Sequence, residues 1–162
     1  MVLHPIGDRS YPRLVPSLPG RVDVYGAWPS LYDSILDMTI AVHRSGLDRR
    51  IIELINVRAS QINGCAHCLD RHTRAGIRIG WDPRHLAVVG AWPDAPWFSD
   101  EERAALALTE TVVGTGPVDG QAVEDARRHF GDDGLSKLLL AISAITAWNR
   151  VNAAAGIEPT ED

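Results

Sequence analysis

The sequence predicts one all-α domain preceded by an extended arm. Three observations indicate this fold class. Apolar residues recur at spacings of three and four over most of the chain, no segment alternates like a strand, and glycine or proline separates the periodic segments. The chain has 162 residues, of which 45% are hydrophobic, so it can bury one core. We expect about six to seven helices.

Residues 1–29 form the predicted arm, and residues 30–157 form the predicted helical domain. The arm contains many prolines, which fix φ and remove backbone donors, so extended chain is expected there. These prolines are Pro5, Pro12, Pro16, Pro19 and Pro29. The arm is also rich in apolar side chains, which predicts that it packs on the domain or on a partner subunit.

The first three predicted helices are defined by their core positions and their ends. One helix is expected from Pro29 to Gly46, because apolar residues there share a face: Leu31, Ile35, Met38 and Val42. Asp48 can cap a second helix, which runs to a break at Asn63-Gly64. A third helix is expected from about Cys65 to Gly80.

Four further helices are expected toward the C-terminus. Pro83 suits the first turn of a short helix, and the stretch over residues 90–98, with two prolines, is expected to be a loop. Ser99 and Glu102 stand at capping-box spacing, at the start of the next helix. The last two helices are expected over residues 119–130 and about 132–155, and Gly131 separates them.

The composition argues against several classes of function. The net charge is −5, so no basic face is available to dominate contact with nucleic acid. The chain lacks the run of about 18 apolar residues that a membrane span needs, and its start lacks the pattern of a secretory signal. We therefore expect a cytoplasmic protein, in which a cysteine pair is more often catalytic or metal-binding than a structural staple.

The chain has two cysteines, three residues apart at the start of a predicted helix. Residues three or four apart share one helix face, so Cys65, Cys68 and His72 are expected to be neighbours. A helix start and a nearby imidazole both favour the thiolate. A thiolate that attacks a peroxide becomes a sulfenic acid, which the second cysteine converts into a disulfide. Glu53, on the preceding helix, could face His72 if the two helices pack antiparallel around Gly64.

The residue types leave alternatives open. Proximity to the helix start favours Cys65 as the nucleophile, and proximity to His72 favours Cys68. A zinc site is chemically possible, but four ligands within eight residues of one helix cannot easily surround an ion tetrahedrally. The cysteines could also be buried small hydrophobes.

The other histidines carry weaker signals. On a helix, His67 faces away from both cysteines, so a structural or intersubunit hydrogen bond is as well supported as catalysis. The remaining histidines show no ligand spacing and are expected to be structural or exposed. They are His4, His43, His85 and His129.

The run from Glu53 to His72 resembles the signature of the alkylhydroperoxidase-D-like (AhpD-like) family, within the carboxymuconolactone decarboxylase superfamily. That signature places a glutamate twelve positions before a Cys-x-His-Cys-x-x-x-His motif. All five positions match in this sequence: Glu53, Cys65, His67, Cys68 and His72. The resemblance covers roughly residues 30–115.

The resemblance implies a helical domain that reduces hydroperoxides and forms homo-oligomers, often trimers or hexamers, with a dimer as a further possibility. It implies that Cys68 attacks the peroxide and Cys65 resolves, and that Glu53 and His72 form a water-mediated proton relay. His67 is a secondary candidate, and no cofactor or metal is implied. A thiol or dithiol reductant supplies the electrons, and the best-known member of the family uses a lipoylated protein.

Two alternative functions stay open. The other branch of the superfamily contains cofactor-free lactone decarboxylases, which lack the paired cysteines. An oligomeric redox-sensing or binding protein with little turnover would keep the same fold and the same motif, because a fold does not fix a function. The physiological peroxide and the electron donor cannot be read from the sequence.

Overall fold

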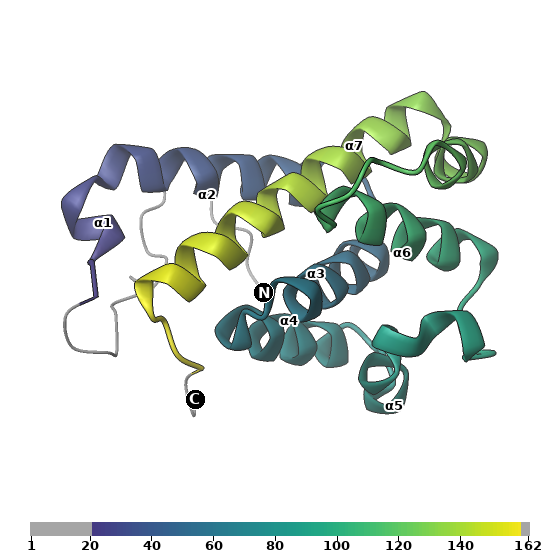
Figure 1. The fold of residues 1–162 in the computed structure, drawn as a ribbon, viewed down its shortest axis with the longest axis horizontal. Coiled ribbons are helices and arrows are strands. Elements are labelled where there is room, and N and C mark those ends of the chain that lie inside the picture. The colour runs from purple at the N-terminus through teal and green to yellow at the C-terminus, as the bar shows by residue number, and fades with distance from the viewer. Residues whose placement is uncertain (1–20, 160–162) are drawn as a thin grey trace.

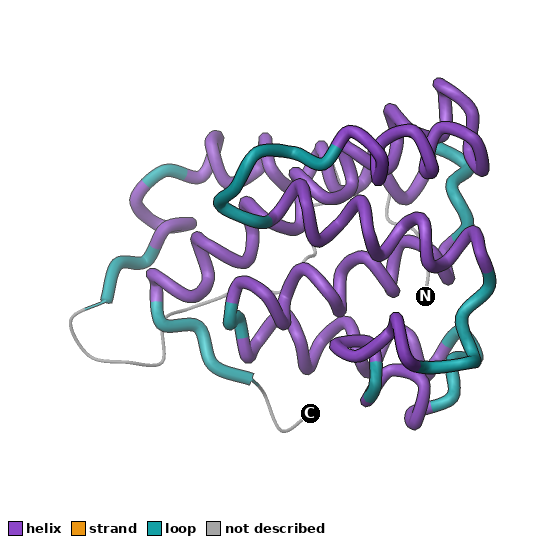
Figure 2. The backbone as a smooth tube through the Cα atoms, turned by 45° about the vertical axis from the view of Figure 1, so that its right-hand side comes forward, coloured by secondary structure: helices purple, strands orange, loops and turns teal. Residues whose placement is uncertain are grey.

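The computed structural model describes residues 21–159, and over this range it contains helices and loops but no strand (Figure 2). This confirms the predicted all-α class. In chain order the elements are α1 (Val24–Ala27), α2 (Pro29–Arg44), α3 (Arg49–Asn63), α4 (Ala66–Arg78), α5 (Pro83–Ala87), the 3-10 helix η1 (Val89–Asp94), α6 (Asp100–Val113) and α7 (Gly120–Ala155).

Helix α3 is the centre of the fold. It packs against α4, α6 and α7, and α7 in turn contacts α2, so that α7 lies between α2 and the α3–α4 pair (Figure 1). Ile55 of α3 belongs to an apolar cluster shared with α6 and α7, whereas Leu54 and Val57 belong to a second cluster with α5, η1 and α6. Because α3 is covered on nearly every side, a polar side chain on it is surrounded by protein.

Several predicted helix ends are confirmed. Ser99 and Glu102 form a capping box at the start of α6, and Pro83 occupies the first turn of α5. The predicted break at Gly131 is present as a kink, because this residue has φ 67° and ψ 178° inside the helical segment α7. The prediction of a loop over residues 90–98 is wrong for residues 90–94, because these belong to η1 (Val89–Asp94). Short 3-10 segments lack the apolar period of an α-helix, so the sequence pattern does not reveal them.

The described end of the arm packs on the domain, whereas residues 1–20 of the predicted arm lie outside the described residues. The described end of the arm, residues 21–29, is not wholly extended, because Val24–Ala27 form the short helix α1. Asp23 caps this helix and accepts the N–H of Gly26 at 2.9 Å. Arg21 donates to the carbonyl of Ala154 at 3.2 Å. Within residues 21–159, none of the helices combines the length and the hydropathy needed to cross a bilayer.

We predict that Gly131→Ala lowers the free energy of unfolding by about 1 to 3 kcal/mol, because the backbone conformation at residue 131 is nearly confined to glycine. A Cβ at this position would meet no atom within 4 Å, so the cost comes from the backbone alone. Gly116 also has open space around it but has no left-handed φ. Gly116→Ala is therefore the control, with a change within about 0.5 kcal/mol. Equal effects of the two substitutions in urea denaturation would contradict the prediction.

Candidate active site

A sharp turn between α3 and α4 sets the positions of both sulfurs. Gly64 ends α3 in the left-handed conformation, with φ 67°, and the N–H of Cys65 then donates to the carbonyl of Ser60 at 3.1 Å. Cys65 is the N-cap of α4, where its sulfur accepts the backbone N–H of Cys68 at 3.3 Å. The sulfur takes the place that a Ser or Asp oxygen usually occupies, at the positive end of the helix dipole.

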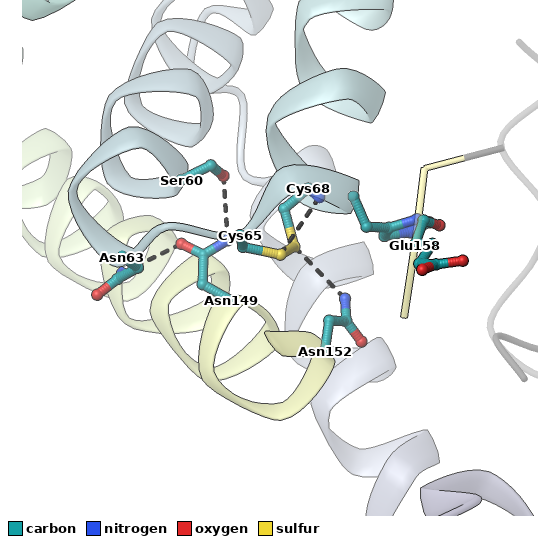
Figure 3. The surroundings of a disulfide bond; sticks show 8 residues. Ser60, Asn63, Cys65, Cys68, Asn149, Asn152 and Glu158 are labelled. Atoms are coloured by element: carbon teal, nitrogen blue, oxygen red, sulfur yellow. Dashed lines mark hydrogen bonds between the residues drawn. A yellow bond between two sulfur atoms is a disulfide. The ribbon is translucent and has the colours of Figure 1, made fainter. Parts of the chain in front are cut away.

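Cys65 and Cys68 are joined in a disulfide, and their Cα atoms are 5.4 Å apart. Each cysteine is 2% exposed. Figure 3 shows the bond lying between the start of α4 and the last turns of α7. The prediction that the two cysteines are neighbours is therefore confirmed, and the structure represents the oxidised state of the pair.

Two buried asparagines of α7 hold the surroundings of the disulfide in place (Figure 3). Asn152 donates from Nδ2 to the sulfur of Cys68 at 3.4 Å. Asn149, which is 0% exposed, is hydrogen bonded to the side chains of Asn63 at 3.1 Å and Ser60 at 3.0 Å. These bonds fix the end of α3 against α7. The sequence-based candidates do not include Asn152, because its contact with Cys68 depends on how α7 packs against α4.

Glu53 and His72 meet where α3 packs on α4, as expected for antiparallel packing around Gly64. Nδ1 of His72 lies 2.7 Å from Oε2 of Glu53, which is 3% exposed. Burial is the largest single influence on the pKa of Glu53, and it raises this pKa. Three neighbours lower it: His72 through its hydrogen bond and its charge, His43 through its charge, and Asn56 through a hydrogen bond. Together they bring the pKa of Glu53 below its ordinary value. Glu53 is therefore ionised at neutral pH. It accepts the Nδ1–H of His72, so Nε2 is the ring nitrogen that does not face the carboxylate.

A cavity of about 310 Å³ opens beside these groups, with walls from α2, α3, α4 and α7. Four of the five motif side chains line it: Glu53, His67, Cys68 and His72. Cys65 does not line the cavity and packs within the apolar core formed by α3, α6 and α7. The two sulfurs therefore differ in their access to a small molecule.

His67 is buried and lines the same cavity as Cys68. Its Nδ1 lies 3.0 Å from the carbonyl oxygen of Glu158, so Nδ1 carries the proton and donates to that oxygen. Burial lowers the pKa of His67, and the hydrogen bond to Glu158 opposes this effect only in part. The side chain is thus neutral at pH 7, and its Nε2 has no partner among the described residues. This hydrogen bond lies within the chain and is of the structural kind that the sequence left open for His67 beside catalysis.

His43 of α2 also lines the cavity, although the sequence gives no reason to single it out. Packing of Val42 with Ile52 of α3 and Ala141 of α7 brings this part of α2 to the site. Burial lowers the pKa of His43, and the charge of Glu53 raises it by less. A lone histidine on an amphipathic helix carries no spacing signal, so only the tertiary structure identifies it.

The zinc arrangement that the residue types permit is not assembled in the part of the chain that the structure describes. Over residues 21–159, no three His, Cys, Asp or Glu side chains are grouped so that they could hold a metal ion. The two sulfurs are bonded to each other. The arrangement that is present combines a disulfide with a carboxylate–imidazole pair.

We predict that the protein loses stability as the pH falls below about 6.5, the ordinary pKa of histidine. His43 and His67 have lowered pKa values in the folded chain, so below this pH the unfolded chain binds more protons and is favoured. Glu53 acts in the same direction at lower pH. Urea denaturation at pH 7.5 and about 5.5 should show the loss, and the loss should be smaller in His43→Gln. His129→Gln, at an exposed position, is the control, and an unchanged loss in His43→Gln would contradict the assignment.

Comparisons of the sequence with known proteins identify the family. The model of the carboxymuconolactone decarboxylase family matches residues 26–111, a segment that contains Glu53, both cysteines and His72. The uncharacterized protein YdfG of Bacillus subtilis (strain 168) is 33% identical over 138 residues, which cover 84% of this chain and 94% of YdfG.

Solved structures share the fold. A protein of unknown function from Agrobacterium tumefaciens, described as a candidate antioxidant defence protein AhpD, matches with a TM-score of 0.84 and 30% identity, over 88% of this chain and 99% of that one. The debrominase Bmp8 has a TM-score of 0.77 at 16% identity, over 86% of this chain and 76% of Bmp8, a likeness that concerns the fold alone. By its sequence and its fold, this chain is an AhpD-like member of the carboxymuconolactone decarboxylase family.

Proposed function

We propose that the protein is a hydroperoxide reductase in which Cys68 attacks the peroxide and Cys65 resolves the product. One observation carries this proposal: the Cys65–Cys68 disulfide borders a cavity that also holds the ionised Glu53 and its partner His72. A carboxylate that orients an imidazole near a nucleophile is a recurrent means of removing that nucleophile's proton.

In the reduced enzyme, Nε2 of His72 takes the thiol proton of Cys68, directly or through water. Glu53 holds the opposite ring nitrogen and stabilises the imidazolium that forms. The amide of Asn152, which donates to the sulfur of Cys68, stabilises the thiolate by a charge-assisted hydrogen bond. Cys68 also lies in the first turn of α4, where the helix dipole favours an anion.

The Cys68 thiolate then attacks the terminal oxygen of R–O–O–H. The S–O bond forms as the O–O bond breaks, two electrons pass from sulfur to the peroxide, and the alkoxide takes a proton from His72 to leave as an alcohol. Cys65 attacks the resulting sulfenic acid, so that the S–S bond forms, the S–O bond breaks, and the hydroxyl leaves as water with the proton of Cys65. An external dithiol returns two electrons and two protons by exchange.

The roles of the two cysteines follow from their surroundings. Cys68 lines the cavity and receives a hydrogen bond from Asn152, so it can meet a substrate as an anion. Cys65 does not line the cavity, and its sulfur already accepts the N–H of Cys68 at the helix cap. This position suits a residue that needs to react only with the sulfur of Cys68.

The proposal includes a thiol or dithiol reductant, with a lipoylated protein as the first candidate, and a homo-oligomeric assembly. The family resemblance supports an assembly, and the exposed large apolar side chains, which lie at separate places on the surface, are positions to test for a subunit contact. The most exposed are Val22, Trp28, Val118 and Leu140. Sedimentation of the protein would give the subunit number.

We predict that Cys68→Ser abolishes hydroperoxide consumption, because the hydroxyl that replaces the thiol cannot be oxidised by a peroxide. Cys65→Ser should still react once and should accumulate a sulfenic acid, which a dimedone label detects by mass spectrometry. The wild-type protein should instead convert two thiols into one intramolecular disulfide per peroxide. Peroxide consumption by the double Cys→Ser variant at the wild-type rate would overturn the proposed function.

We predict that Glu53→Gln slows oxidation of the reduced enzyme by about 10²-fold or more, because the neutral amide cannot stabilise a protonated His72. The amide has nearly the same volume as the carboxylate, so the loss reports charge rather than packing. Glu124→Gln, on the exposed face of α7, removes the same charge away from the cavity and should keep the wild-type rate. The rate of thiol loss after mixing with cumene hydroperoxide measures both variants, and equal rates would exclude Glu53 from the proton relay.

A further inference from the structure

Three arginines line the cavity beside Cys68, and peroxide reduction as proposed above gives them no role. They are Arg71, Arg74 and Arg78, and their spacing of three and four places them along one face of α4. Among the described residues that line the cavity, Glu53 is the one carboxylate, and it is hydrogen bonded to His72. Arg74 is partly neutralised by Asp70, at 2.8 Å. Since the whole chain has a net charge of −5, this group of three arginines is a local feature.

The walls from α2 and α7 include an apolar and aromatic area beside the polar side chains of Thr39, His43 and Asn152. Tyr32 and Leu36 of α2 and Ile145 and Trp148 of α7 form this area. The rings of Tyr32 and Trp148 are in edge contact, with centroids 4.9 Å apart, and the indole N–H of Trp148 donates to Thr39 at 2.8 Å. These contacts fix a rigid aromatic surface. Hydrogen peroxide has no apolar part that could use such a surface, whereas an organic hydroperoxide has one.

The helix geometry relates the arginines to the sulfur. A rise of about 1.5 Å per residue places Arg71 about 4.5 Å, Arg74 about 9 Å and Arg78 about 15 Å from Cys68 along the axis of α4. An anionic group bound by these arginines would therefore lie roughly one to three helix turns from the reacting oxygen. The cavity of about 310 Å³ is at the lower end of the range for small-molecule sites, which fits a compact apolar body between the two polar ends.

From this arrangement we infer that the oxidising substrate is an organic hydroperoxide that also carries a carboxylate. The carboxylate binds the arginine row of α4, the apolar body packs on Tyr32 and Trp148, and the hydroperoxide reaches the sulfur of Cys68. Arginine matches a carboxylate with paired hydrogen bonds, and its charge also speeds the encounter. The inference rests on the proposed function and names its substrate class; the carboxylate takes no part in the redox step.

The test compares three matched peroxides: cumene hydroperoxide, its para-carboxylate derivative, and the methyl ester of that derivative. Each is mixed with fully reduced protein from which the reductant has been removed, and thiol loss gives a second-order rate constant. The acid should react about tenfold faster than the ester at low ionic strength, and salt should shrink this ratio. Because the reductant is absent, a preference that belongs to the electron donor cannot produce the difference. A preference for the acid that appears only when a reductant is present would overturn the inference.

Variants test whether the ratio of the acid rate to the ester rate depends on the arginine row, that is Arg71, Arg74 and Arg78. The double variant Arg71→Gln/Arg78→Gln should bring the ratio of acid to ester close to one, and Arg78→Lys should keep part of it. Arg78→Gln alone, at an exposed position, should lower the ratio in the same direction, so the test does not depend on the double variant folding. Arg128→Gln removes the same charge from a residue outside the cavity and should leave the ratio at its wild-type value.

The outcomes distinguish a failure of the substrate inference from a failure of the proposed function. A wild-type ratio near one, or a ratio that Arg128→Gln lowers as much as Arg78→Gln, would overturn the inference. Oxidation of the thiols by cumene hydroperoxide in the same experiment would leave the proposed function standing. If none of the three peroxides oxidises the wild-type thiols, the proposed function fails, and the substrate inference fails with it.

Discussion

The Glu53 carboxylate is a charge buried in the middle of a helical core, and its hydrogen bond with His72 stabilises it there. A carboxylate that is 3% exposed and has no partner would strongly destabilise the folded chain. The ionised Glu53 therefore depends on its hydrogen bond with His72, and this bond depends on the register between α3 and α4. The left-handed residue Gly64 lets α4 turn back along α3 at the register that brings the two side chains together. The same turn makes Cys65 the helix cap and gives Cys68 its position on the cavity.

The last helix contributes both to the packing of the core and to the surroundings of the disulfide. Asn149 joins α7 to the end of α3 through Asn63 and Ser60, and Asn152, three residues later, reaches the sulfur of Cys68. Buried amides of this kind are costly unless their hydrogen bonds are made, so they restrict how α7 can sit on the α3–α4 pair. The positions of the two cysteines are thus fixed in part by a helix that is distant from the motif in sequence.

How far the sequence allows prediction depends on whether a signal is local. Helix ends such as the Ser99–Glu102 box and the kink at Gly131 are encoded within one turn, and the Glu53–His72 contact follows from two adjacent helices joined by a short turn. His43 and Asn152 depend on how α2 and α7 pack around α3, which neither periodicity nor spacing reveals. The 3-10 helix η1 lacks an apolar repeat that would distinguish it from a loop.

The hydrogen bond between His67 and the carbonyl of Glu158 ties the tail of the described chain to the first turn of α4. This carbonyl decides which ring nitrogen of His67 keeps its hydrogen, and therefore whether the unpartnered Nε2 offers a lone pair to the cavity. An affinity tag or fusion partner that moved residues 157–159 away would break this hydrogen bond, and either ring nitrogen of His67 could then carry the hydrogen. The position of residues far from the cysteine motif thus helps to set which hydrogen-bonding group a bound molecule encounters.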